Sequence, residues 1–259
     1  ATYTMRAGRD DDVFPQGAPD DLQKKAIDLE IENKFHLELD ELPASIHTFI
    51  ICCEQLHSRL IHGDEVMKLC TLFRQRFDQI QMICYLRPQV DLATSLYTTA
   101  LWYRSKLTLP EFVYVHHATN PLYYDYSKLL DRWASAVGSS SITIRRFDKN
   151  SLEDSDIVTD FFIHGIGDSS LMSGAGTIAR KNASLSVNGQ RLLLLYNRCI
   201  RDLAEKITRG RSTRFTRNFL RKYFSGKGAR LDAEARPTFQ ALFSAGNAKV
   251  AANYFNDNT

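Results

Sequence analysis

The sequence predicts an α/β protein, in which helices cover both faces of a parallel sheet in three layers and the C-terminal third is helical. Two apolar runs of strand length, HTFIICC at residues 47–53 and QMICYL at residues 81–86, enclose a segment with helical periodicity. Continuous apolar runs are typical of parallel strands that are buried on both faces. Strand, helix and strand in this order predict a crossover unit whose two strands are parallel neighbours.

The remaining elements follow from the same patterns. Residues 1–45 are expected to be irregular at first and then helical over about 20–40. The helix between the two apolar runs is predicted by the spacing of its apolar residues, Val66, Leu69, Phe73, Phe77 and Ile80. Farther along, we expect a helix over 89–106, a long loop over 107–122, a helix over 124–137 and a strand over 141–147. The last third is predicted to hold helices over 155–165, 187–207, 212–224 and 233–255, the last one broken near Gly246.

Length and composition indicate one globular domain. The chain has 259 residues, of which 44% are hydrophobic and 24% charged, which is ordinary for such a domain. We divide residues 1–259 into an N-terminal region (1–45), a core of strands and helices (46–150) and a mainly helical, basic part (151–259).

The composition also indicates where in the cell the protein is located. No stretch approaches the roughly 18–20 apolar residues of a membrane span, so none is expected. Five cysteines lack any metal-binding spacing, which favours reduced structural thiols, a cytoplasmic location and no metal. The chain starts without Met and without an apolar signal core, and we therefore expect Ala1 to be the end of a fragment.

Charge is distributed unevenly along the chain. The net charge is only +3, but residues 1–43 hold 11 acidic and 5 basic side chains. Residues 198–230, in contrast, hold 11 basic and 2 acidic side chains. The basic C-terminal region is suited to an anionic ligand.

Charged residues stand directly after both apolar runs of the predicted crossover. Glu54 follows HTFIICC, and Arg87 follows QMICYL. Open parallel sheets bind ligands beyond the carboxyl ends of their strands, so we expect both side chains to face one crevice. The alternative that each is a solvated charge at a strand end stays open.

The residues after Arg87 favour a phosphate site. Pro88 suits the first turn of a helix, and Ser95 then lies in its second turn. A guanidinium, a hydroxyl and the free N–H groups of a helix start together suit a phosphate. Ser95 could equally be a small residue that packs on the sheet.

A second basic constellation is FSGKGARL at residues 224–231. Gly226 and Gly228 flank Lys227 and free the backbone to approach a ligand, while Lys227 and Arg230 supply charge. The segment lacks the GxxxxGK(S/T) pattern of a nucleotide P-loop, and an exposed loop between helices would look the same. The basic helix before it could be a solvated face, or could bind nucleic acid or an acidic polysaccharide.

Two histidines lie in the predicted loop over 107–122. His116 and His117 could line an acceptor cleft or simply lie on the surface. No GxSxG elbow supports a Ser-His-Asp arrangement.

Several stretches together resemble bacterial PAPS-dependent sulfotransferases (PAPS is 3′-phosphoadenosine-5′-phosphosulfate). The stretches are IICCEQL, MICYLRPQVDLATSLYTTAL, YDYSKLLDRWASAVG, ITIRRFD, DIVTDFFIHGIG, NASLS and NAKVAANYF. The resemblance covers roughly residues 45–255, and its most specific element is the pair of Arg87 and Ser95, eight residues apart. That pair is similar to the segment that binds the donor's 3′-phosphate in this family.

The resemblance implies a fold, a reaction and roles. The fold would be of the P-loop nucleotide-hydrolase and sulfotransferase type. The reaction would move a sulfuryl group from PAPS to a hydroxyl or amine of an acceptor, a carbohydrate or small molecule. Glu54 would be the catalytic base, and Lys227, with Gly226, Gly228 and Arg230, would help hold the 3′-phosphate.

One departure from the family concerns its N-terminal loop, which resembles HIGTHKTGTTS and holds the 5′-phosphosulfate. Residues 1–45 contain no such loop, and offer only Lys24, Lys25 and Lys34 without the glycines. Either the natural N-terminus is missing, which we favour, or the protein has lost the loop.

Two alternative functions stay open. The first is a non-catalytic module that binds a nucleotide or an acidic glycan; nucleic acid is not an expected partner. The second is a nucleotide-sugar glycosyltransferase, for which only DDD at residues 10–12 offers a metal-binding pattern.

Overall fold

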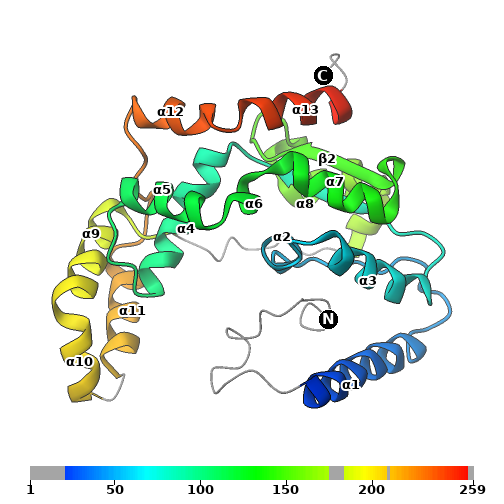
Figure 1. The fold of residues 1–259 in the computed structure, drawn as a ribbon, viewed down its shortest axis with the longest axis horizontal. Coiled ribbons are helices and arrows are strands. Elements are labelled where there is room, and N and C mark those ends of the chain that lie inside the picture. The colour runs from blue at the N-terminus through cyan, green and yellow to red at the C-terminus, as the bar shows by residue number, and fades with distance from the viewer. Residues whose placement is uncertain (1–20, 175–183, 209–210, 256–259) are drawn as a thin grey trace. The chain divides into compact units, whose positions relative to one another are not determined.

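The computed structural model describes residues 21–174, 184–208 and 211–255, and Figure 1 shows the order of their elements. The chain separates into two compact units, one of residues 1–84 and 126–143 and the other of residues 85–125 and 144–259. About 67% of the structure is helical, and it also holds a small parallel sheet. None of the described helices is long and apolar enough to cross a membrane.

Two parallel strands, β1 (Met82–Leu86) and β2 (Ile142–Arg146), form the sheet. They confirm the strands predicted over 81–86 and 141–147. The backbone N–H of Phe147 continues the ladder by donating to the carbonyl of Leu86 (2.7 Å). Within the described residues the only other β pairing is an isolated bridge, so the structure shows the coarse α/β class and two strands of the predicted three-layer sheet.

The strand predicted over 47–53 is wrong. Residues 45–53 form no strand, and the apolar side chains of Ile46, Phe49, Ile50 and Ile51 are 42–50% exposed. A parallel strand needs hydrogen-bonding partners from distant parts of the chain, and no described residue supplies them to this run. The strand–helix–strand crossover therefore lies later in the chain, between β1 and β2.

The first unit is built on helices. They are α1 (Asp21–Asp40), α2 (Gln55–Arg59), α3 (Gly63–Arg74), α7 (Tyr126–Val137) and the short turn η1 (Ser139–Ser141). His62 and Glu65 form a reciprocal capping box at the start of α3. The helix packs against α7, and the apolar side chains of the pair are buried: Val66, Leu69, Cys70, Leu129, Leu130, Trp133 and Ala136. The predicted helices over 20–40 and 124–137 are confirmed.

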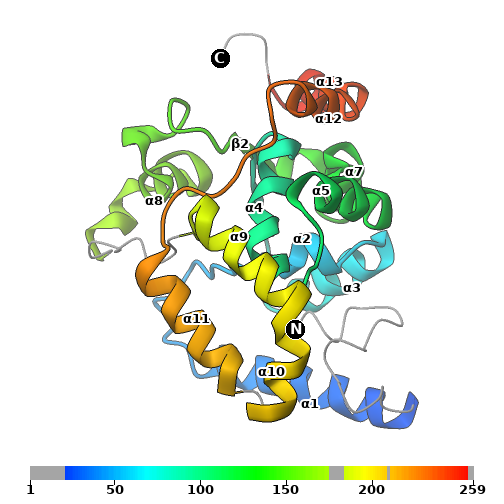
Figure 2. The same ribbon diagram turned by 90° about the vertical axis from the view of Figure 1, so that its left-hand side faces the viewer.

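The second unit is centred on α4 (Gln89–Trp102), which confirms the helix predicted over 89–106. Its buried residues recur at helical spacing and form one face: Val90, Ala93, Tyr97 and Leu101. Residues of α5 (Leu109–Thr119), α9 (Val187–Leu195), α11 (Arg211–Tyr223) and α12 (Ala235–Ala241) complete this core, among them Phe112, Leu193, Leu220 and Phe239. Figure 2 shows α9 alongside α4.

The loop predicted over 107–122 is wrong. This segment forms α5 (Leu109–Thr119) and α6 (Pro121–Tyr124). Thr108 and Glu111 form a capping box (2.7 Å) at the start of α5. Pro110 and Pro121 each lie in a first helical turn, where the missing N–H costs nothing.

The helical C-terminal third is confirmed. Its elements are η2 (Glu153–Ser155), α8 (Ile157–Asp160), the π-helical η3 (Phe161–Ile166), η4 (Ser169–Gly174), α9 (Val187–Leu195), the π-helical η5 (Tyr196–Ile200), α10 (Arg201–Thr208), α11 (Arg211–Tyr223), α12 (Ala235–Ala241) and α13 (Ser244–Tyr254). The last predicted helix is broken at residues 242–243 rather than near Gly246. Both views show α10 and α11 side by side (Figures 1 and 2).

Side chains from the C-terminal third form hydrogen bonds with backbone groups at both ends of α4. At its start, the N–H of Val90 donates to Oε1 of Gln240 (3.1 Å). At its end, Nδ2 of the buried Asn197 donates to the carbonyls of Leu101 (2.7 Å) and Ser105 (3.0 Å). Helix ends leave backbone groups without intrahelical partners, so α4 depends on α12 and η5 for its caps.

Candidate functional site

Arg87 stands where the sequence predicts it, directly after β1. Its guanidinium carbon Cζ lies 5.8 Å from the ring centroid of Phe147, the residue that follows β2. The half-buried cation is therefore held at the carboxyl end of the sheet. This is the edge where open parallel sheets bind their ligands.

The start of α4 offers less to an anion than predicted. The N–H of Val90 is engaged by Gln240, and the carboxylate of Asp91 pairs with Arg236 (2.8 Å). Ser95 is exposed, and its hydroxyl donates to the carbonyl of Leu92 (2.8 Å). An anion here would depend on Arg87 more than on the helix dipole, and the Ser95 hydroxyl would have to turn away from Leu92 to donate to it.

One turn after Ser95, a group of polar contacts joins α4 to the glycine loop of residues 226–230. Nε2 of Gln190 donates to Oγ1 of Thr98 (2.7 Å), and Oγ1 of Thr98 lies 3.3 Å from Oγ of Ser184. Oε1 of the same buried amide accepts the N–H of Ala229 (2.8 Å). We name Thr98, Ser184, Gln190 and Ala229 the Thr98 cluster.

Each glycine of the loop lies where a larger residue would be strained or crowded. Gly226 has φ +153°, in the region that favours glycine, and its N–H donates to the carbonyl of Ser184 (2.8 Å). A Cβ at Gly228 would lie 2.5 Å from Nε2 of Gln190 and 3.3 Å from the carbonyl oxygen of Leu185. The glycines thus allow the loop to lie close against the Thr98 cluster.

The loop carries exposed cations beside neutral polar groups. Lys227 and Arg230 are both exposed, and the Thr98 cluster contains no carboxylate. The structure therefore brings together the Ser95 face of α4 and the GKG loop, which the sequence presents as separate sites. Arg87, Ser95, Lys227 and Arg230 are the side chains that could hold an anionic nucleotide.

The members of the Thr98 cluster were missed from the sequence alone. Only the stretch NASLS, at residues 182–186, signals them, because a serine there can cap a helix. Ser186 does cap α9, since its Oγ accepts the N–H of Gly189 (3.3 Å). The contact between Gln190 and Thr98 spans 92 residues and has no local signature.

Glu54 does not lie at the end of a strand. It is exposed and precedes the short helix α2, within the first compact unit. Arg87, Ser95 and Lys227 belong to the second unit. The role of Glu54 as a base stays a prediction.

His116 and His117 are on α5 and pack among aromatic rings. Nδ1 of His116 lies 2.8 Å from the hydroxyl of the buried Tyr124, and burial lowers the pKa of His116. The ring of His117 meets the ring of Phe243 edge-on, with centroids 5.2 Å apart. These contacts are typical of core side chains and give no support to an acceptor cleft.

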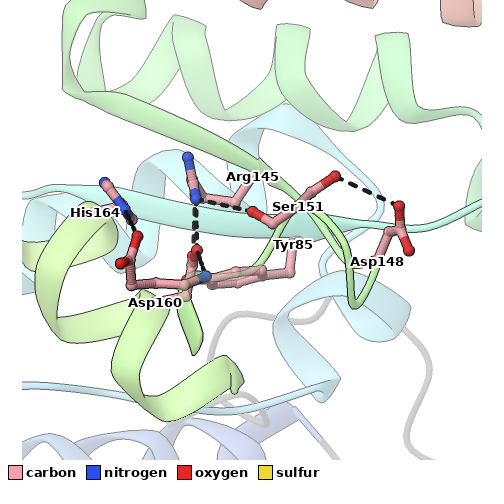
Figure 3. A network of polar contacts seen from close by, with 7 residues as sticks. Tyr85, Arg145, Asp148, Ser151, Asp160 and His164 are labelled. Carbon is pink, nitrogen blue, oxygen red and sulfur yellow. Dashed lines mark hydrogen bonds and ion pairs between the residues drawn. The ribbon is translucent and has the colours of Figure 1, made fainter. Parts of the chain in front are cut away.

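A second polar group, which the sequence did not reveal, surrounds Asp160 at the ends of β1 and β2 (Figure 3). Oδ1 of Asp160 accepts the hydroxyl of Tyr85 (2.7 Å) and Nε of Arg145 (3.0 Å). Oδ2 accepts the N–H of Glu153 (3.0 Å) and a second guanidinium nitrogen of Arg145. We name Tyr85, Arg145, Glu153 and Asp160 the Asp160 cluster.

The electrostatics of the Asp160 cluster indicate a structural role. Burial would raise the pKa of Asp160, but the hydrogen bonds from Arg145, Tyr85 and Glu153 and the charge of Arg145 outweigh it and lower the pKa to about 2. The same burial and the bond to Asp160 raise the pKa of Tyr85. Both carboxylate oxygens are satisfied, so the cluster ties the two strand ends to the turn before α8.

A metal site has no support from the described residues, among which no group of three or more His, Cys, Asp or Glu is placed to hold an ion. No family model matches the chain, and no curated protein or solved structure matches it either. Its function must therefore be inferred from its own residues.

Proposed function

We propose that the chain is a PAPS-dependent sulfotransferase that acts on a hydroxyl or amine of a carbohydrate or small molecule. The observation that carries this proposal is the Thr98 cluster, which joins the Ser95 face of α4 to the loop around Lys227. Both elements are those that the sequence resemblance assigns to the donor's 3′-phosphate. Their convergence supports one donor site in place of two unrelated basic segments.

The charges around this site suit a phosphate. Arg87 and Lys227 provide cations, and hydrogen bonds to ionised phosphate are about twice as strong as neutral ones. Gly226 and Gly228 let the loop that carries Lys227 lie close against the Thr98 cluster. Because the start of α4 is occupied by Gln240, we infer that side chains bind the phosphate and the helix dipole contributes little.

The proposal also includes a specific type of α/β fold. We infer a single domain with a three-layer parallel sheet of the P-loop nucleotide-hydrolase and sulfotransferase type, working in the cytoplasm. The parallel pairing of β1 and β2, with Arg87 at its carboxyl end, supports this inference.

In the proposed reaction, Glu54 accepts the proton of the acceptor hydroxyl as its oxygen attacks sulfur. A new oxygen–sulfur bond forms, the bond from sulfur to the bridging oxygen breaks, and adenosine 3′,5′-bisphosphate leaves. Negative charge grows on the bridging and sulfuryl oxygens, so positioning and cations should supply most of the rate enhancement, by analogy with phosphoryl transfer.

The position of Glu54 favours a second candidate, a non-catalytic module that binds the same nucleotide or an acidic glycan. An exposed glutamate before α2 is not held at a strand end as a base would be. Of the other residues considered at the N-terminus, Lys34 pairs with Glu30 (2.6 Å) on α1. Lys25 is exposed on α1, whereas Asp10–Asp12 and the side chain of Lys24 lie outside the described part of the chain.

Calorimetric titration with adenosine 3′,5′-bisphosphate tests the donor site. We expect a Kd below about 1 mM, and an affinity 10- to 100-fold lower in Arg87→Ala and in Lys227→Ala, because each loses a charge-assisted contact of about 1.5–3 kcal/mol. Lys34→Ala is the matched control, because Lys34 is an exposed lysine far from this loop in sequence, and it should bind like the wild type. Absence of binding by the wild type would contradict the sulfotransferase and would leave the second candidate only as a module that binds an acidic glycan.

A transfer assay separates the two candidates. If the chain transfers labelled sulfate from PAPS, Glu54→Gln should lose turnover while it keeps bisphosphate affinity. Binding without transfer to any hydroxyl or amine acceptor supports the binding module. Unchanged turnover in Glu54→Gln would remove Glu54 from the mechanism.

A further inference from the structure

The neighbouring helices α10 and α11 expose apolar side chains in the last turns of α10 and along α11. Ile207, in the last turn of α10, and Phe215, in the second turn of α11, are each 72% exposed. Leu203 lies one turn before Ile207 and is also exposed. Contiguous exposed apolar surface marks an interaction site for protein or membrane.

Along α11 the exposed apolar residues form a stripe. Phe215, Phe219 and Tyr223 are spaced by four residues and are all exposed. The ring centroids of Phe215 and Phe219 are 6.3 Å apart, and those of Phe219 and Tyr223 are 5.2 Å apart. The three rings thus form a continuous apolar surface on one side of the helix.

Basic residues outnumber acidic ones in the sequence of this region, by eight to two over residues 201–223. The sequence of α11, RSTRFTRNFLRKY, contains five basic residues and no acidic one. On α10, the carboxylate of Asp202 is already paired with Lys106 (3.0 Å). Arg217 and Arg221 are exposed and lie over the ring of Trp102, with Cζ 5.5 and 6.0 Å from its centroid.

The combination of exposed apolar side chains and basic residues favours some kinds of partner over others. Single-stranded nucleic acid uses cations and aromatic rings but leaves aliphatic side chains such as Ile207 and Leu203 in water. A second copy of this helix pair would bring like charges together. An anionic bilayer takes both features, since its headgroups attract Lys and Arg while its acyl boundary accepts Phe, Ile and Leu.

We propose that the α10–α11 helix pair docks on the surface of an anionic lipid bilayer, with Ile207 and Phe215 inserted at the level of the headgroups. Basic amphipathic helices with Phe and Leu on the apolar face bind membranes in this way. The surface uses none of the residues of the proposed donor site, so this inference does not rest on sulfuryl transfer.

Vesicle flotation of the full chain tests the proposal. We expect it to float with phosphatidylcholine vesicles that contain phosphatidylglycerol and not with pure phosphatidylcholine, and added salt should weaken binding. Ile207→Ser and Phe215→Ser should each lower the partition coefficient about tenfold through lost apolar burial. Lys222→Gln should lower it about fivefold through lost attraction to the anionic surface.

Leu242→Ser is the matched control, because Leu242 is an exposed leucine between α12 and α13 and should leave binding unchanged. Circular dichroism of each variant establishes that the helices are retained. Equal binding to neutral vesicles, no binding to either kind, or wild-type binding by both Ile207→Ser and Phe215→Ser would overturn the proposal. A dimer in light scattering that Phe215→Ser dissociates would assign the surface to a second copy and overturn it as well.

Discussion

The Asp160 cluster and the Thr98 cluster both join distant segments of the second unit. They differ in whether their groups are charged and in whether exposed cations lie beside them. In the Asp160 cluster a fully buried carboxylate faces a guanidinium, and both of its oxygens are bonded. The Thr98 cluster consists of neutral groups and adjoins the exposed cations Lys227 and Arg230. A cluster whose charges are paired and whose carboxylate oxygens are all bonded stabilises the fold. A neutral cluster beside exposed cations is suited to an anionic ligand.

The largest expected effect is on the Asp160 cluster. Asp160→Asn leaves the partly buried guanidinium of Arg145 without its counter-charge, so the free energy of unfolding should fall by about 3–5 kcal/mol. Urea denaturation measures this loss. Asp148→Asn is the control, since Asp148 is exposed and nearby, and it should change stability by less than about 0.5 kcal/mol. Equal effects of the two substitutions would contradict a stabilising role for the cluster.

Acid should weaken the same cluster. The pKa of Asp160 is about 2 in the folded state, below its ordinary value of 3.8, so its stabilising contribution is complete above the ordinary value and is lost as pH falls toward 2. At neutral pH the contribution amounts to about 2 kcal/mol, at roughly 1.4 kcal/mol per pKa unit. The difference in the free energy of unfolding between the wild type and Asp160→Asn should therefore shrink by about 2 kcal/mol as pH falls from about 5 to about 2. A constant difference over this range would show that the carboxylate's charge is not responsible.

A smaller effect is expected at the Thr98 cluster. In Gly228→Ala the new methyl group meets the buried Gln190, and we expect a loss of about 1–3 kcal/mol in stability. Displacement of the loop should also weaken binding of adenosine 3′,5′-bisphosphate. Gly63→Ala is the control, because a Cβ there meets no atom within 4 Å. If the affinity is unchanged despite the loss of stability, the loop does not contact the nucleotide.

Elements with a strong local pattern were predictable from the sequence. β1, β2, α4 and α7 combine apolar periodicity with clear breakers, and each was found where the pattern places it. The run at residues 47–53 has the same apolar character and is not a strand, because strand formation depends on partners that the run itself does not encode. Pro110 and Pro121 were misread as loop residues, although they are equally suited to helix starts.

The site was predictable only in parts. Arg87, Ser95 and Lys227 stand out by their neighbours in the chain, but the amide of Gln190 that joins their segments does not. The Asp160 cluster was missed because Arg145 and Tyr85 are 15 and 75 residues from Asp160 in sequence. One signal was present, since Arg145 lies within the short strand β2, directly after Ile144, where a partly buried charge needs a partner.

The double capping of α4 has a consequence for synthesis of the chain. The N–H of Val90 meets its acceptor 150 residues later, in Gln240. At the usual ribosomal rate of about 5–20 residues per second, roughly 8 to 30 seconds separate the two residues. During that interval the nascent helix must rely on water at its first turn, so the central helix of the second unit is completed only when α12 has left the ribosome.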